Sequence, residues 1–243
     1  MLASAAVLII LLSLLFPAVR LASAKAREAS CVSNLRMLQV AHQLYLGDNR
    51  QQFIPYYGSV LWMSMLIPYH TSGSNEKRDR LRFCPNATTF AGASPSTCDW
   101  YYSPDGSWGS YGMNGYMYSP FWAQDMPGND WLVGGRYCPR LGMDQLRKKW
   151  IGSTARAATN TPLFLDCQWV DLWPREDLAL PDNRVNVSIY GLSDPDSAGS
   201  MVRSSITRHE QGICIVFVDG HAGRIPINGL KKLKWSMDWQ NGN

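Results

Sequence analysis

The chain has 243 residues, of which 46% are hydrophobic and 17% are charged, and its formal net charge is +4. A chain of this length and composition can bury the core of one sizeable domain, which excludes an intrinsically disordered protein. The net charge is small and the sequence has no long run of Lys and Arg, so we expect no nucleic-acid partner.

Residues 1–19 carry no charged side chain and read MLASAAVLIILLSLLFPAV. As a helix this stretch would measure about 29 Å, close to the roughly 30 Å core of a bilayer. We therefore expect residues 1–24 to form the membrane-inserted half of a longer helix. Pro17 removes one backbone donor, which predicts a kink or a local opening at that point. The residues expected to pack this half are Leu8, Ile9, Leu12, Leu15 and Phe16.

Two other interpretations of the first segment stay open. Ala22-Ser23-Ala24 resembles the small-residue cleavage site of a signal peptide, although no basic residue precedes the apolar run. An ordinary membrane anchor is the second alternative. Arg20, Lys25 and Arg27 follow the apolar run, and the positive-inside rule taken alone would place the body in the cytoplasm.

Residues 25–48 have the pattern of an amphipathic helix. Cys31, Leu35, Leu38 and Tyr45 recur at helical spacing and are expected to pack against the body, with Val32, Ala41 and Leu44 beside them. The opposite face is polar and comprises Arg27, Glu28, Asn34, Arg36, Gln39 and Gln43. Gly47-Asp48-Asn49 is a helix stop signal. The two halves together predict a helix of about 70 Å, which one small domain cannot bury.

Residues 49–243 are expected to form a globular body. In chain order, the pattern predicts a short helix at Val60–Leu66, loops with short strands through residue 130, a helix at Leu141–Ile151 and a strand at Thr161–Val170. Asp171–Pro174 is then expected to be a turn. The clearest strand is ICIVFV, which Asp219-Gly220 joins to HAGRI in a predicted hairpin.

These elements together predict an α+β fold. An antiparallel sheet of at least three strands is expected to pack against the amphipathic half of the long helix. The predicted organisation is therefore residues 1–24 as the membrane or filament-core half, residues 25–48 as the amphipathic half, and residues 49–243 as the body.

Several polar groups could carry chemistry, but none forms a convincing site in the sequence. The six cysteines contain no CxxC pair, and in an exported protein they permit disulfides with about 15 connectivities, among which the sequence does not choose.

His209, Asp219 and His221 could form a metal or acid–base cluster, whereas Asp219 is also a good turn residue. Asp194, Asp196 and Asp219 are weak metal candidates, and calcium is the ion that suits such oxygens. Asp105, Asp166 and Asp171 are isolated carboxylates. We expect neither a catalytic site nor a bound cofactor.

Both ends of the chain resemble the type IV pilins and type II secretion pseudopilins. The stretch KAREASCVSNLRMLQVAHQLYLGDNRQQFIP is similar to a helix motif of a large prepilin-like group, and Pro17 matches the proline of the family's N-terminal helix. The C-terminal region has the group's His, nine residues, Asp-Gly pattern in His209, Asp219 and Gly220, followed by His221. Phe83-Cys84-Pro85 and Tyr111–Gly115 extend the resemblance into the centre.

The resemblance implies a structural subunit of bacterial origin that is not an enzyme. Such a subunit crosses the inner membrane once, has its body outside the cytoplasm, and assembles with itself and other pilin-like subunits into a filament. The filament would be a pilus or a secretion pseudopilus, at the periplasm or the cell surface. The family's cleavage site and glutamate would fall a few residues before Met1, which would make prepilin peptidase a partner and allow N-methylation. Some pseudopilins also bind structural calcium.

Two other functions stay open. A membrane-anchored module could bind polysaccharide by stacking sugars on Trp100, Trp108, Trp122 and Trp131. An anchored secreted hydrolase would depend on His209 or Asp219.

Overall fold

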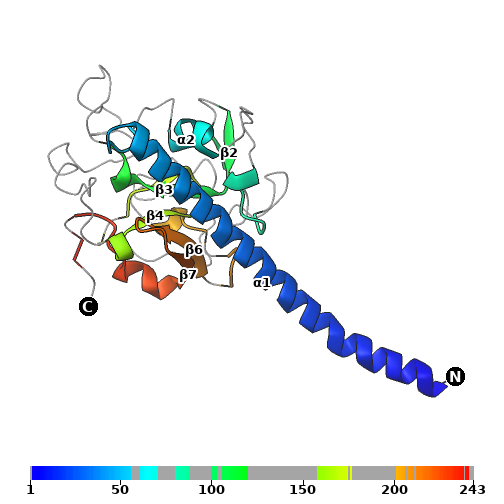
Figure 1. The fold of residues 1–243 in the computed structure, drawn as a ribbon. Helices are drawn as coiled ribbons and strands as arrows, with labels where there is room; N and C mark the ends of the chain where they lie inside the picture. Colours follow the sequence, from blue (N-terminus) through cyan, green and yellow to red (C-terminus); the bar gives the residue numbers. More distant parts are fainter. Residues whose placement is uncertain are drawn as a thin grey trace.

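The computed structural model shows a long N-terminal helix that leaves a body built around a β-sheet (Figure 1). This arrangement confirms the expected α+β class. The structure describes residues 2–55, 61–70, 80–87, 100–102, 106–119, 158–174, 176, 201–205, 207–210, 212–237 and 239–240. The helix predicted at Leu141–Ile151 lies outside the described residues.

Helix α1 (Leu2–Asp48) is one continuous helix that includes both the apolar and the amphipathic segment. Pro17 lies inside it, with helical residues on both sides, and a kink at this position stays a prediction. The helix runs through Gly47 and ends one residue later. The chain then turns with two residues in left-handed conformation, Arg50 and Gln51, and the N–H of Gln51 donates to the carbonyl of Leu46 at 2.8 Å. Figure 1 shows that the N-terminal half projects away from the body.

Five strands form the main sheet in the order β5-β3-β4-β6-β7. Their bounds are β3 (Tyr111–Asn114), β4 (Pro162–Asp166), β5 (Asp171–Leu172), β6 (Gly212–Phe217) and β7 (Ala222–Pro226). The pairs β3–β4, β4–β6 and β6–β7 are antiparallel, whereas β5 pairs with β3 in parallel. The prediction of an antiparallel sheet is therefore wrong at one edge, where β5 runs parallel to its neighbour β3. A separate two-stranded sheet pairs β1 (Trp100–Tyr102) with β2 (Ser107–Gly109).

The strand predicted at Thr161–Val170 is shorter than expected and divides into two parts. Strand β4 ends at Asp166, residues 168–170 bend, and Asp171–Leu172 forms β5 in place of the expected turn. The reason is topological, because β4 lies on one side of β3 and β5 on the other, so the chain must cross over the end of β3. The carbonyl of Val170 accepts from the N–H of Met113 at 3.0 Å on this path.

The predicted hairpin forms between β6 and β7. Gly220 has a φ of +92°, a conformation that a residue with a Cβ rarely adopts, and its N–H donates to the carbonyl of Phe217 at 3.0 Å. Every residue of β6 is buried, as expected of a central strand covered on both faces.

The second half of α1 packs on one face of the sheet. Cys31, Leu35 and Leu38 are fully buried there, and Tyr45 is nearly so. Two residues depart from the expected pattern. Leu44 is 52% exposed, whereas Gln39 is buried and donates to the carbonyl of Val218 at 3.2 Å. Gln39 was expected on the polar face, and its inward position is explained by this hydrogen bond to the end of the hairpin.

Other described elements cover the two faces of the sheet. Helix α2 (Trp62–His70) lies against α1 and begins two residues later and ends four residues later than the helix predicted at Val60–Leu66. The opposite face of the sheet is covered by η7 (Ile227–Lys232), Trp235 and Trp239. The described residues also form the short 3-10 helices η1 (Arg80–Arg82), η2 (Gly115–Met117), η4 (Ala158–Asn160) and η6 (Met201–Arg203).

Candidate functional site

The N-terminal half of α1 exposes its large apolar side chains. Ile9, Leu12, Leu15 and Phe16 are each more than half exposed, and the same holds for Ile10, Leu11, Val19 and Leu21. The side chain of Leu8 is not described. In the described part of the chain, α1 is the one helix long and apolar enough to cross a membrane, and a signal sequence near an N-terminus shares these properties.

The helix enters the body between residues 27 and 31. Arg27 donates from Nε to Oδ1 of Asn86 at 2.6 Å, and Cys31 is the first fully buried residue among the described side chains of α1. Toward the N-terminus, charged groups interact within the helix itself. Lys25 pairs with Glu28 at 3.2 Å, and the Arg20 guanidinium lies 4.3 Å from the centre of the Phe16 ring. Position 27 therefore separates a free apolar helix from a helix held by the body.

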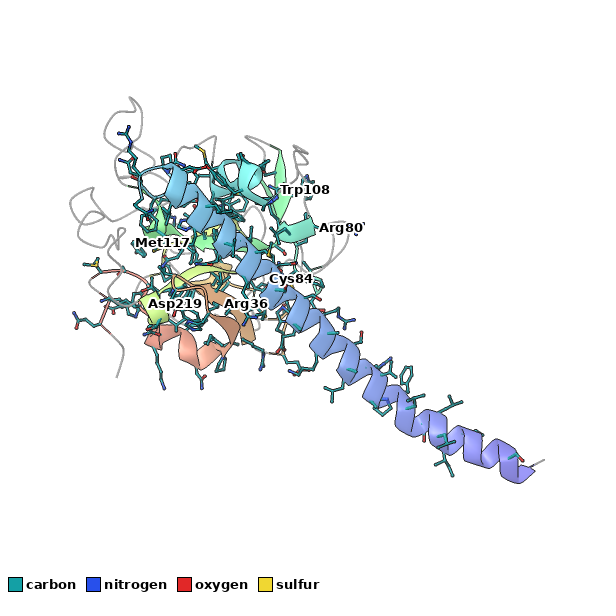
Figure 2. All side chains as sticks on the ribbon, in the orientation of Figure 1. Arg36, Arg80, Cys84, Trp108, Met117 and Asp219 are labelled. Atoms are coloured by element: carbon teal, nitrogen blue, oxygen red, sulfur yellow. The ribbon has the colours of Figure 1, made fainter. Side chains whose placement is uncertain are left out.

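A cluster of four buried polar residues lies close to this exit point. Cys31 comes from α1, Cys84 from the segment after η1, Asp166 from the end of β4, and His209 from the turn before β6. Each is at most 3% exposed, and their ligand atoms lie within 4.8 Å of one another. Figure 2 shows Cys84 beside α1 where the helix leaves the body. We call these residues the Cys–Asp–His cluster.

Three distances define the cluster. The Sγ of Cys84 lies 3.1 Å from Nε2 of His209, and the same Nε2 lies 3.2 Å from Oδ2 of Asp166. The Sγ of Cys31 lies 3.5 Å from Oδ2 of Asp166. These contacts link Cys84 to His209, His209 to Asp166 and Asp166 to Cys31, so that the four ligand atoms are grouped around a common point.

The surroundings of the cluster hold Asp166 in place. The backbone N–H of Cys214 donates to Oδ2 of Asp166 at 3.0 Å, and Nη1 of Arg208 lies 3.4 Å from Oδ1. Arg208 also donates to the carbonyl of Ser110 at 2.5 Å. Tyr111 donates from its hydroxyl to Sγ of Cys31 at 3.4 Å. The carboxylate is therefore both paired and oriented, as a buried charge requires.

The cluster shifts the pKa values of its members. Burial alone would raise the pKa of Asp166, but the hydrogen bond from His209 and the charge of Arg208 outweigh it and hold that pKa below its usual value. Burial would likewise lower the pKa of His209, whereas its bonds to Asp166 and Cys84 raise it to about 10. The pKa of Cys31 is raised by burial, and that of Cys84 by its hydrogen bond to Cys31 and by burial. Without a ligand, the cluster is an ion pair with two neutral thiols.

The geometry does not suit a catalytic relay of cysteine, histidine and aspartate. In such a relay the nucleophile and the carboxylate contact different nitrogens of the imidazole. Here Cys84 and Asp166 both contact Nε2, while Nδ1 faces the Asn86 side chain at 3.4 Å. The four residues are also buried, so that a substrate has no open approach to the thiol.

The structure separates the residues that the sequence had grouped at the C-terminal motif. His209 belongs to the Cys–Asp–His cluster, whereas Asp219 and His221 are exposed on the hairpin and bond to each other at 2.7 Å. Figure 2 shows Asp219 well apart from Cys84. His209, Asp219 and His221, which the sequence left open as one possible cluster, therefore do not meet, because β6 carries the two ends of the motif to opposite ends of the sheet. Asp194 and Asp196 lie outside the described residues.

Sequence reasoning missed the role of Asp166 and did not connect Cys31 with Cys84. The sequence analysis treated Asp166 as an isolated carboxylate, although a charged residue at the end of an apolar strand needs a buried partner. Cys31 was predicted only to pack against the body. The four described cysteines, Cys31, Cys84, Cys167 and Cys214, form no disulfide, and Cys98 and Cys138 lie outside the described residues.

The tryptophans proposed to bind sugar are described only in part. Trp108 is half-buried on β2, and Trp100 lies on β1. Trp122 and Trp131 lie outside the described residues.

Comparison of the chain with protein-family models, with curated proteins and with solved structures yields no match. Its function is therefore inferred from its own residues and their geometry.

Proposed function

We propose that this chain is a pilin-like structural subunit. The first half of α1 anchors it in the inner membrane with the body outside the cytoplasm, and the same half then packs against the α1 helices of other subunits in a filament. The observation that carries the proposal is the helix itself, which exposes large apolar side chains between Ile9 and Leu21 and is held by the body along its second half.

The free energy of burying apolar side chains favours transfer of the first half of α1 from water into lipid or against neighbouring helices. Burying one Leu, Ile or Phe side chain stabilises by about 1.5–3 kcal/mol. The eight large apolar side chains exposed from Ile9 to Leu21 therefore represent on the order of 10 kcal/mol that lipid or neighbouring helices would supply. A soluble monomer would leave this surface in water, where it promotes association.

The connection between anchor and body also favours a subunit. Because α1 is one continuous helix, a neighbour that binds its first half positions the body directly, with no flexible linker between them. The helix is fixed to the sheet by the buried side chains from Cys31 to Leu46. An anchor that only tethered a binding module would not require this rigid junction.

The proposal predicts that one charge in the free half abolishes function. Leu12→Asp places a carboxylate among apolar side chains, at a cost of about 3 kcal/mol for the insertion of a helix. We expect the variant to shift from the membrane fraction to the soluble fraction and to lose filaments. The measurement is membrane fractionation followed by electron microscopy of sheared cell-surface material.

Leu12→Phe is the matched control, because it changes the same position but keeps the surface apolar. This variant should fractionate with the membrane as the parent does. Normal membrane insertion and normal filaments from Leu12→Asp would overturn the proposed function.

A further inference from the structure

The Cys–Asp–His cluster contains four metal-ligand groups that come from four separate parts of the chain. We propose that Cys31, Cys84, Asp166 and His209 together bind one Zn²⁺ ion that holds α1 to the body. The site does not depend on the membrane role proposed above.

The ligand types suit zinc. Two sulfurs, one imidazole nitrogen and one carboxylate oxygen form a mixed set that Zn²⁺ accepts, whereas calcium and magnesium select oxygen ligands only. Four protein ligands without an open position are typical of a structural zinc site. Because all four residues are buried, the ion would be closed off from water.

The distances fit a tetrahedron of ligands around one ion. Zinc bonds of about 2.0–2.3 Å at tetrahedral angles place neighbouring ligand atoms roughly 3.3–3.8 Å apart. The Cys31 sulfur and the Asp166 oxygen are 3.5 Å apart, and the Cys84 sulfur and the His209 nitrogen are 3.1 Å apart. The His209 nitrogen lies 3.2 Å from the Asp166 oxygen. The other pairs of ligand atoms lie within 4.8 Å of each other, so shifts of up to about 1 Å would complete the coordination.

The charges also balance around one divalent ion. Two thiolates and one carboxylate would carry three negative charges against two on the metal, and Arg208 supplies the third positive charge. The guanidinium of Arg208 is fully buried and lies 3.4 Å from the second carboxylate oxygen of Asp166. A neighbour that orients a ligating carboxylate in this way is typical of metal sites.

A disulfide between Cys31 and Cys84 is the main competing outcome. It would use both thiols, but it would leave the convergence of His209 and Asp166 on the same point without a role. Zinc accounts for all four groups, and the bond it forms would connect α1 to β4 and to the turn before β6.

The first test measures the metal content of the full chain, purified in detergent with a thiol reductant. We expect about one zinc per chain by elemental mass spectrometry. Cys84→Ser should lower the zinc content at least tenfold. Cys167→Ser is the matched control, because Cys167 is also a buried free cysteine but donates to the carbonyl of Arg203 outside the cluster. This control should keep its zinc.

A second test uses the parent chain alone, so that a folding defect in a variant cannot decide the result. Removal of metal with a chelator should lower the melting temperature by several degrees, and added Zn²⁺ should restore it. Co²⁺ added to the stripped chain should give the visible absorption of a tetrahedral site, with a sulfur charge-transfer band in the ultraviolet.

The proposal is overturned by any of three results. One is equal zinc content in Cys84→Ser and the parent, and another is a chelated chain that neither loses stability nor binds Co²⁺. The third is a Cys31–Cys84 disulfide, detected by non-reducing peptide mass mapping in chain isolated from cells without reductant.

Discussion

At the scale of single residues, His42 is the most unusual side chain that the sequence did not single out. It lies on the buried face of α1, with its ring centre 5.5 Å from that of Phe53 and 6.1 Å from that of Phe164. Among the residues that the structure describes, neither of its ring nitrogens has a hydrogen-bond partner. Burial lowers the pKa of His42 to about 4, so that the ring is neutral near pH 7.

His42 should make the body less stable in acid. The unfolded chain takes up a proton at this residue below about pH 6.5, whereas the folded chain does not do so until about pH 4. His42 therefore does not affect the free energy of unfolding above about pH 6.5. As the pH falls below that value, His42 lowers the free energy of unfolding progressively, by about 3 kcal/mol near pH 4. Urea unfolding of the parent and of His42→Leu over this range measures the difference.

His42→Leu removes the titrating group and keeps an apolar side chain of similar size. The difference in unfolding free energy between the variant and the parent should be small at pH 7.5 and should grow in the variant's favour toward pH 4.5. A constant difference across the range would show that His42 does not titrate as its burial implies.

At the scale of elements, the β6–β7 hairpin was predictable and strand β5 was not. Asp219-Gly220 between two β-rich runs is a local signal, and the structure places Gly220 in the left-handed conformation that the turn requires. Strand β5 instead depends on parallel pairing with β3, which lies far away in the sequence. Local composition made Asp171-Leu172 a good turn, but the tertiary position of the segment made it an edge strand.

The positive φ of Gly220 predicts a conformational cost for any side chain at that position. Gly220→Ala should lower the free energy of unfolding by about 1–2 kcal/mol. The added Cβ would also lie 3.2 Å from the side-chain oxygen of Gln39, which can move aside. Chemical denaturation of the full chain in detergent measures the change.

Gly223→Ala is the matched control on the next strand. The structure places nothing within 4 Å of a Cβ at Gly223, and this residue does not have a positive φ. Its unfolding free energy should equal that of the parent within about 0.5 kcal/mol. Equal stabilities of Gly220→Ala and the parent would show that the turn is not strained as described.

At the scale of the whole molecule, the long helix could be predicted and the Cys–Asp–His cluster could not. The helix has a continuous signal, because an uncharged apolar run leads into residues at helical spacing without a glycine before Gly47. The cluster has no local signal, since 125 residues separate Cys84 from His209. The inward position of Gln39 was unpredictable for the same reason, because it depends on the carbonyl of Val218, which is distant in the sequence.

The second half of α1, which packs on the body, also carries exposed apolar residues that a simple anchor would not need. Met37, Val40 and Leu44 are 51%, 47% and 52% exposed and recur at helical spacing. In a filament we expect a second copy of the chain to cover this stripe. Val40→Lys should therefore retain membrane insertion but lower filament yield at least tenfold, as measured by fractionation and electron microscopy.

Gln43→Lys adds the same charge one turn away without removing an apolar side chain, and it should assemble as the parent does. Loss of filaments in both variants would assign the effect to charge, whereas normal filaments from Val40→Lys would exclude the stripe from the interface.

The fate of the apolar half of α1 tests the central proposal most directly. Intact mass and N-terminal sequencing of the protein from its native membrane would decide it. We predict a mature chain that retains Leu2–Ala24, which leaves the exposed apolar helix available for lipid and for other subunits. A mature chain that begins at Lys25 would contradict the proposal, because the apolar segment would then be a removed signal peptide and the body a soluble exported protein.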